Sequence, residues 1–235
     1  MRVLFRIIII GSLLFLPCVS VTAQSGEVII KSDGDLSKSV IDSLKYVLPQ
    51  FERGTIYFKD GQRSEGVFNI NTIIPSVSFI QNNQDTLILK PEIEKVVSSV
   101  FLGERVWRKI GGYMEIVDSY SGLELGVERR LVFEQPKKVV GYGVTAESAA
   151  VDSYKYYESG GLGFNLSSRY VNVPYKYSML TFILQDGKRV VPNKKLMKKI
   201  FPGKDKEIDS YIKSNDINFR KVEDVKRLFV YCKSL

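Results

Sequence analysis

A serine and a lysine one helical turn apart form the most suggestive catalytic pattern in the chain. The segment Ser210-Tyr211-Ile212-Lys213 matches S-x-x-K, in which a lysine activates the serine nucleophile of penicillin-binding enzymes. Those enzymes also require S-D-N and K-T-G elements, and the sequence contains neither. We therefore interpret this segment as an ordinary exposed helix.

Metal, phosphate and histidine chemistry find no better support. The chain has no histidine, which excludes His-based triads, His-ligated metals and catalysis by an imidazole. Asp205, Glu207 and Asp209 alternate, so on a helix their carboxylates diverge and we expect no metal site. Residues 160–163 (GGLG) lack the lysine of a phosphate-binding loop, and we interpret them as a flexible loop. We expect no cofactor.

The first 23 residues have the pattern of a secretory signal peptide. Two arginines precede an apolar stretch at residues 7–16, which Pro17 ends, and we expect cleavage just before Gln24. The alternatives are an uncleaved anchor, for which the stretch is short, and lipidation of Cys18, which the preceding proline disfavours. We expect an exported protein, periplasmic or outer-membrane-associated, with no transmembrane span after cleavage.

Tyrosines gather in the middle of the chain and are candidates for ligand binding. Exposed tyrosine rings are rigid recognition groups that can stack on sugars. The interpretation that we favour is that alternating tyrosines line strands and are half-buried. Trp107 lies in a strand pattern, where we expect it in the core. The candidates are Tyr154, Tyr156, Tyr157 and Tyr170, with Tyr175 and Tyr177 beside them.

Basic residues concentrate in the C-terminal fifth of the chain. Residues 186–235 contain 14 Lys and Arg against 7 Asp and Glu, and the whole chain has a formal net charge of +8. We interpret this charge mainly as a solvated helical face. A short amphipathic helix could also bind anionic lipid or an acidic glycan through Lys194, Lys195, Lys198 and Lys199. Export argues against nucleic acid as a partner.

The elements that must position these groups begin, after the signal segment 1–23, with a β-rich body at residues 24–191. Short strand patterns recur every 8–12 residues and are separated by turn signals such as Asp60-Gly61 and Asp186-Gly187. They predict a mostly antiparallel meander, barrel- or sandwich-like, interrupted by an irregular excursion at residues 136–173. The strand patterns cover residues 55–58, 65–74, 76–80, 86–89, 94–102, 104–110, 113–118, 123–134, 175–184 and 188–191.

Helical patterns complete an α+β fold. Apolar spacing at residues 36–48 predicts a short N-terminal helix. The basic segment 192–235 predicts two to three helices packed on the sheet, because its apolar residues recur at spacings of three and four. We interpret the thiol of Cys232 as a small buried group, with an intermolecular disulfide as the alternative. The last apolar stripe consists of Val222, Val225, Leu228, Phe229 and Cys232.

Three stretches of the chain together carry a resemblance to other proteins. They are Tyr46-Val47-Leu48-Pro49 with Phe51, Gly54 and residues 57–61; Gly141-Tyr142-Gly143 and the Ser/Ala-rich run after it; and Phe201-Pro202, Ile208, residues 211–213 and Phe219 before Glu223-Asp224. The set resembles uncharacterised exported proteins of Bacteroidetes-type Gram-negative bacteria. The resemblance spans most of the chain after the signal segment. It implies an envelope location and transfers no catalytic residue.

These observations favour a non-enzymatic envelope protein that acts as a binding or scaffold module, with another envelope protein as its partner. The alternative is a module that binds a glycan or an anionic surface through the tyrosine-rich region or the basic helix. A hydrolase is a third hypothesis, because Asp, Glu, Ser, Lys and Tyr suffice for some hydrolytic chemistry. The sequence does not place any two carboxylates at a catalytic separation.

Overall fold

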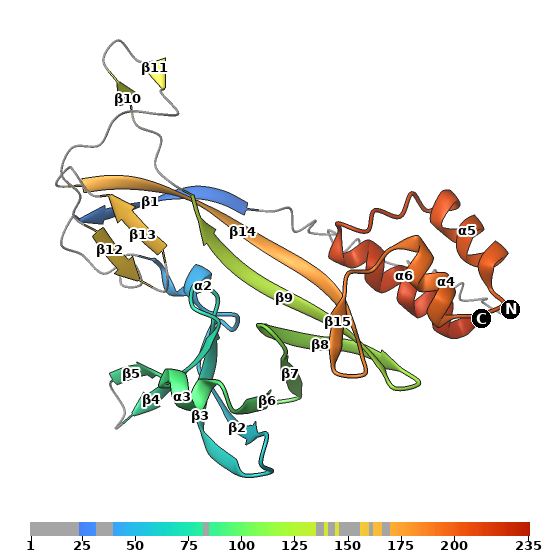
Figure 1. Cartoon of the computed structure of the whole chain (residues 1–235), viewed down its shortest axis with the longest axis horizontal. Helices are drawn as coiled ribbons and strands as arrows, with labels where there is room; N and C mark the ends of the chain where they lie inside the picture. Colours follow the sequence, from blue (N-terminus) through green and yellow to red (C-terminus); the bar gives the residue numbers. More distant parts are fainter. Residues whose placement is uncertain are drawn as a thin grey trace, which may run out of the picture.

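The structure is a computed structural model of the chain, and its fold is α+β (Figure 1). The chain forms a large antiparallel sheet and ends in three helices, which confirms the fold class expected from the sequence. The signal segment and Cys18 lie outside the described residues. The structure describes residues 24–31, 40–81, 85–134, 139–140, 144–145, 156–159, 162–165 and 170–235.

The main sheet is open, and all its described pairings are antiparallel. Its strand order is β1-β14-β9-β8-β7-β6-β2-β3-β4-β5, and β15 also pairs with β14. The strands are β1 (Gln24–Lys31), β2 (Glu52–Phe58), β3 (Arg63–Asn71), β4 (Ser76–Gln81), β5 (Asp85–Ile88), β6 (Val97–Leu102), β7 (Arg105–Lys109), β8 (Tyr113–Tyr120), β9 (Leu123–Phe133), β14 (Tyr170–Gln185) and β15 (Lys188–Val190). Two separate hairpins are β10 (Val139–Val140) with β11 (Val144–Thr145), and β12 (Tyr156–Ser159) with β13 (Leu162–Asn165).

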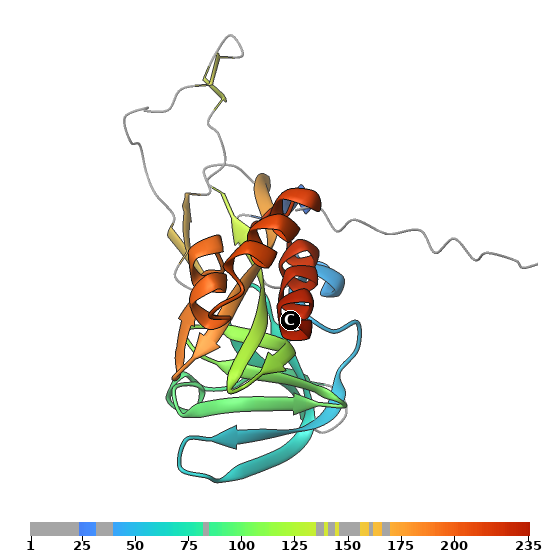
Figure 2. The ribbon, with the colours of Figure 1, turned by 90° about the vertical axis from the view of Figure 1, so that its right-hand side faces the viewer.

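Three of the described helices form a unit that we call the helical cap. It consists of α4 (Lys194–Ile200), α5 (Asp205–Ser214) and α6 (Val222–Ser234), which confirms the expected C-terminal helices. Figure 2 shows the cap lying across one end of the sheet. The other two helices, α2 (Asp42–Lys45) and α3 (Pro91–Glu94), are single turns.

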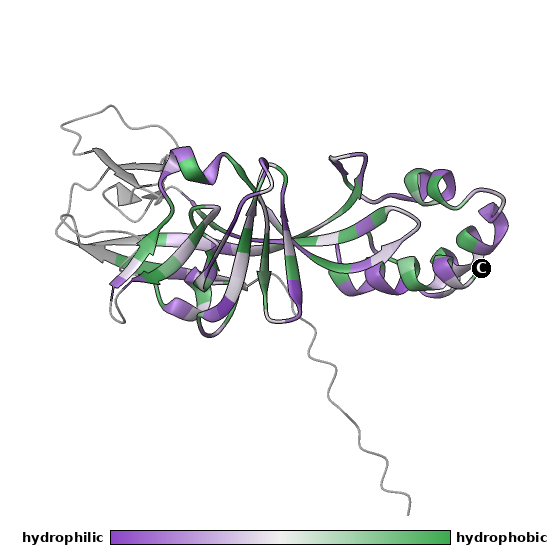
Figure 3. Cartoon of the chain, turned by 90° about the horizontal axis from the view of Figure 1, so that it is seen from below, coloured by the Kyte–Doolittle hydropathy of each residue, from purple (hydrophilic) through white to green (hydrophobic). Residues whose placement is uncertain are grey.

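Strand pairing assigns the residues of each strand to one of the two faces of the sheet. Residues directly opposite one another share a face, so Leu125 of β9 and Ile183 of β14 lie together, as do Glu128 and Leu180. We call the side of Leu125 the inner face and the side of Glu128 the outer face. Apolar and polar residues alternate along part of the strands (Figure 3), but the outer face also has a small apolar cluster of Met114, Phe182 and Leu184.

The inner face contributes to three hydrophobic cores. The body core packs β2, β3, β4, β6 and β7 around Trp107, which is 1% exposed and was expected in the core. The N-terminal core packs β1, β9 and β14 against α2 through Val28, Leu131 and Val173. The cap core packs the cap helices onto Leu125 and Ile183. One sheet therefore supports the body, the N-terminal strand and the cap.

An N-cap begins the first helix of the cap, and two side-chain contacts hold the cap against the sheet. The Asn193 side chain accepts the N–H of Leu196 at 2.9 Å and begins α4. The Tyr120 ring at the tip of β8 stacks on Phe201 with centroids 5.4 Å apart. Lys233 of α6 forms an ion pair with Asp118 of β8. Hydrophobic packing supplies the main attraction, and these contacts fix the orientation.

Cys232 lies in the cap core and is 3% exposed, which confirms it as a small buried group. It forms no disulfide. Burial raises the pKa of its thiol to about 11, so the thiol stays protonated at neutral pH.

Of the helix predicted over residues 36–48, the structure confirms only Asp42–Lys45; residues 36–39 lie outside the described residues, and the prediction is wrong over residues 46–48. α2 ends at Lys45, and the next residues run extended beside β3. The cause is the buried side chain of Asn69, which accepts the N–H of Leu48 at 3.2 Å and donates to its carbonyl at 2.9 Å. Leu48 is 1% exposed in the body core. A side chain distant in sequence thus replaces the helical hydrogen bonds.

Two strand boundaries also differ from the expectation. The strand predicted over residues 94–102 begins only at Val97, because Pro91 starts the helical turn α3. The excursion predicted over residues 136–173 contains two described hairpins and the first four residues of β14. Those residues pair with β1, a contact across the whole body that local pattern cannot reveal.

A buried carboxylate on the outer face joins β9 to β15. Glu128 forms ion pairs with Arg130 at 2.8 Å and with Arg189 at 3.1 Å, and its side chain is 2% exposed. Gly112 leaves room for it, because a Cβ there would lie 1.9 Å from Glu128 Oε1. A buried charge of this kind is tolerated only while its partners stay in place.

We expect Gly112→Ala to lower the free energy of unfolding by about 2–4 kcal/mol, because the methyl group must displace Glu128 from its arginines. Urea denaturation measures the change. Gly61→Ala is the control, since its φ of +86° strains alanine but no atom lies within 4 Å. We expect it to cost only about 1–2 kcal/mol. A Gly112→Ala protein as stable as the wild type would contradict this account.

A second carboxylate fastens the turn between α5 and α6. Asp224, in the first turn of α6, accepts the Asn218 N–H at 3.0 Å and pairs with Arg227 at 2.7 Å. Burial raises the pKa of Asp224, but the Asn218 hydrogen bond and Arg227 outweigh it, so the pKa lies below its ordinary value. Folding therefore stabilises the ionised form of Asp224 relative to its protonated form.

Because the folded pKa of Asp224 is depressed, its contribution is present above the unfolded pKa of about 4 and is lost as pH falls through the folded value. We expect Asp224→Asn to destabilise the protein by about 1–2 kcal/mol at pH 7, and by less at pH 3. Denaturation at both pH values measures this convergence. Asp216→Asn, at an exposed turn, should follow the wild type at each pH. A destabilisation by Asp224→Asn that is the same at pH 3 and pH 7 would refute the assignment.

Candidate functional site

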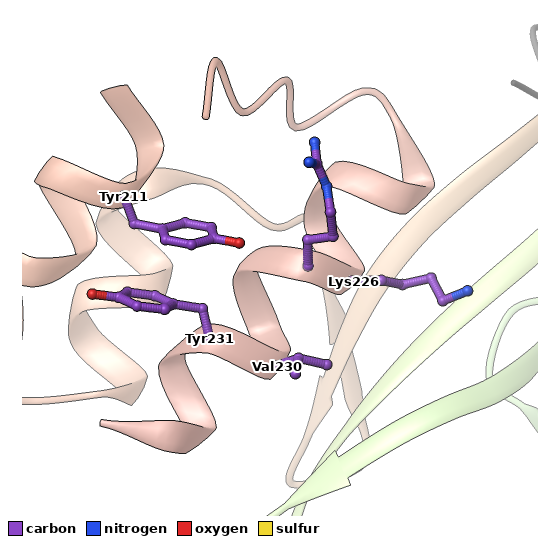
Figure 4. Close-up of a pocket in the computed structure, with 5 residues that line it drawn as sticks. Tyr211, Lys226, Val230 and Tyr231 are labelled. Carbon is purple, nitrogen blue, oxygen red and sulfur yellow. The ribbon is translucent and has the colours of Figure 1, made fainter. Parts of the chain in front are cut away.

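A shallow hollow lies on the helical cap between α5 and α6. Its volume is about 410 Å³, and it is lined by Tyr211, Lys226, Arg227, Val230 and Tyr231. Figure 4 shows the two tyrosine rings one above the other, with their hydroxyls pointing in opposite directions. We call this feature the cap hollow.

The apolar part of the cap hollow is held rigidly. The rings of Tyr211 and Tyr231 stack with centroids 3.9 Å apart and an interplanar angle of 12°. Both rings also pack on the edge of the cap core. Val230 beside them is 56% exposed, although it belongs to a helix with a well-formed buried stripe. A preformed apolar surface of this kind needs little ordering to bind a partner.

Two cations lie at the rim of the cap hollow. Lys226 pairs with Glu223 at 3.2 Å, and the two side chains are 38% and 72% exposed. Exposed pairs of this spacing contribute little energy, so Lys226 can exchange its partner for an external acid. Arg227 is held by the more buried Asp224. The rim therefore combines one exchangeable and one fixed positive charge.

The four candidate lysines of α4 divide into two pairs. Lys194 and Lys198 lie 3.0 Å and 2.8 Å from Asp209 of α5, and these two lysines, Lys198 foremost, lower the pKa of that carboxyl. Lys195 and Lys199 are exposed and make no ion pair with any described residue. The structure thus leaves two of the four lysines available to an external anion.

The candidate tyrosines lie mostly outside what the structure describes. Tyr154 is outside the described residues. Tyr156 and Tyr157 belong to β12, and Tyr170 begins β14, but their side chains are not among those described. The neighbouring Tyr175 and Tyr177 are described and pack half-buried against the N-terminal core. Burial raises the pKa of Tyr177.

Two further carboxylates of the body are held by several partners each. Glu94 accepts from Lys109 Nζ and Tyr113 Oη at 2.5 Å, and from Ser76 Oγ and Val77 N at 3.2 Å. Burial, with Glu94 adding to it, raises the pKa of Tyr113 well above its ordinary value. Glu115 pairs with Arg129 at 2.5 Å and with Arg105 at 4.0 Å. These arrangements fasten strands together, since each acid binds groups from neighbouring elements.

The residues of the S-x-x-K pattern and of the alternating-acid pattern all lie on α5. Ser210 and Lys213 are both exposed on α5. Of the alternating acids, Asp209 forms ion pairs with two lysines of α4. The described residues contain no cluster of three acids or cysteines placed to bind a metal ion. None of the described helices has the length and apolarity needed to cross a bilayer.

Sequence reasoning missed the cap hollow, although one signal was present. Val230 is the apolar residue of α6 that the buried stripe Val225, Leu228, Phe229 and Cys232 leaves out. An apolar residue off the stripe, next to a tyrosine, indicates a surface that the core does not use. The stacking of Tyr231 on a tyrosine from another helix required the structure.

Neither family models, nor curated proteins, nor solved structures yield a match to this chain.

Proposed function

We propose that this protein is a non-enzymatic binding module of the cell envelope that holds another envelope protein on its helical cap. The observation that carries the proposal is the cap hollow, where two stacked tyrosines and an exposed valine lie beside two cations. Tyr and Arg are the side chains that most often dominate the energy of protein interfaces. The chemistry of the hollow therefore fits a protein partner with an apolar anchor and a nearby acid.

The rest of the fold supports this role by fixing the hollow in place. The cap core ties α5 and α6 to the ends of β9 and β14, and Lys233 ties α6 to β8. A binding surface on such a frame loses little conformational freedom when a partner docks. The export pattern at residues 1–23 supports the envelope as the compartment.

The proposal is tested with a photo-reactive amino acid at Val230, in cells that export the protein. We expect a covalent adduct with one envelope protein, identified by mass spectrometry. The matched control is the same amino acid at Leu180, which is 40% exposed on the outer face of the sheet. Adducts of equal yield and identity at both positions would count against the cap as the binding surface.

Binding measurements with the purified partner then show how much each variant changes the affinity. We expect Val230→Glu, at an exposed position, and Tyr231→Ala each to weaken binding at least about 10-fold, as expected at an interface hot spot. Isothermal calorimetry measures the affinity, and thermal melting checks that each variant is folded. Leu180→Glu should leave the affinity unchanged. Undiminished binding by Val230→Glu would refute the role of the hollow.

A second candidate function, binding to an anionic surface, is favoured by the exposed Lys195 and Lys199. We expect Lys195→Gln with Lys199→Gln to weaken binding to vesicles containing phosphatidylglycerol by roughly 30-fold, at about 1 kcal/mol per lysine. The control is Lys206→Gln with Lys213→Gln, which removes the same charge from α5. Equal losses in a sedimentation assay would indicate only unspecific attraction by net charge.

A further inference from the structure

The main sheet ends in an uncovered strand. β5 is the last strand on the path β2-β3-β4-β5, and it pairs with β4 alone among the described strands. All four of its residues, Asp85 to Ile88, are exposed. A strand of this kind has a row of backbone groups available to another strand.

The hydrogen-bond pattern shows which groups of β5 face outward. The N–H of Leu89 donates to the carbonyl of Val77 at 3.0 Å, so these two residues occupy a hydrogen-bonded position of the β4–β5 ladder, although the N–H of Val77 donates to Glu94. Such positions recur every second residue, which makes Leu87 the next residue that bonds to β4. Thr86 and Ile88 therefore direct their N–H and C=O groups away from the sheet, and no described residue bonds to them.

Apolar side chains flank this free edge on both faces. Leu87 lies on the inner face beside Phe79, and Ile88 lies on the outer face with Ile80 diagonally across from it. Leu87 and Ile88 are each 39% exposed, and Ile80 is 36% exposed. An added strand would cover apolar surface on both faces as well as form hydrogen bonds.

We propose that β5 pairs in antiparallel fashion with β5 of a second copy of this chain, about a two-fold axis at Leu87. Thr86 of one copy then lies opposite Ile88 of the other, and each such pair exchanges two hydrogen bonds. The two Leu87 side chains meet on the inner face. A continuous sheet results, with the same patch used by both copies.

Charge favours the antiparallel arrangement of two copies. Asp85 begins β5 and Lys90 lies two residues after its end, so each copy has an acid at one end and a base at the other. Antiparallel pairing brings the acidic end of one copy to the basic end of the other, whereas parallel pairing would bring like ends together. A four-residue pairing is small, so we expect a weak dimer that forms as concentration rises.

The test is sedimentation equilibrium of residues 24–235, which contain every described residue, over a wide concentration range. We expect reversible dimerisation of the wild type. Thr86→Pro removes one outward N–H and places a ring at the edge, without removing a bond to β4, and we expect it to weaken the dimer at least about 10-fold. Thr86→Val keeps the N–H and should dimerise like the wild type.

Amide hydrogen exchange provides a second readout. We expect the Thr86 and Ile88 amides of the wild type to exchange more slowly at dimer-forming concentrations, with no such change in Thr86→Pro. A circular-dichroism spectrum identical to the wild type shows that the variant is folded. A wild type that stays monomeric, including one that captures a strand of another protein at this edge, overturns the proposal. So does a dimer that Thr86→Pro leaves intact.

Discussion

The pairing of β9 with β14 is the interaction on which the rest of the structure depends. Its described register runs from Phe133 opposite Tyr175 to Glu124 opposite Leu184. Leu125 and Ile183 receive the cap at one end of this pair, and the N-terminal core forms at the other. Because side chains alternate between faces, a slip of one residue would move each of these contacts to the wrong side of the sheet. The positions of the helical cap and of the N-terminal strand β1 therefore both depend on the register between β9 and β14.

The sequence predicted those elements whose signals are local. Asp60-Gly61 and Asp186-Gly187 occupy hairpin turns, with positive φ at both glycines. The apolar stripe of α6 is buried as its spacing indicates, except for the half-buried Val222 at its start. Local pattern failed where a distant partner decides the backbone. The segment after Lys45 leaves the helix because Asn69 bonds to Leu48, and the first residues of β14 are strand because β1 lies beside them.

The candidate site could be predicted only in part, for a related reason. The sequence identified a basic face on α4 but could not separate its lysines, because the acid that binds Lys194 and Lys198 lies on another helix. Val230 stood off its helical stripe and was a readable signal. Its neighbours in the cap hollow were not readable, since the stacking of Tyr211 on Tyr231 depends on how α5 and α6 pack.

The position of Cys232 allows the docking of the cap on the sheet to be followed by chemical labelling of its thiol. The thiol lies within the cap core, where the protein shields it, and its raised pKa suppresses the reactive thiolate. An alkylating reagent can reach it only when α6 separates from the sheet, so the rate of labelling follows the local opening equilibrium. In a chain that begins at Gln24 it is the only thiol. The native sequence therefore contains its own kinetic reporter of cap opening, with no engineered probe.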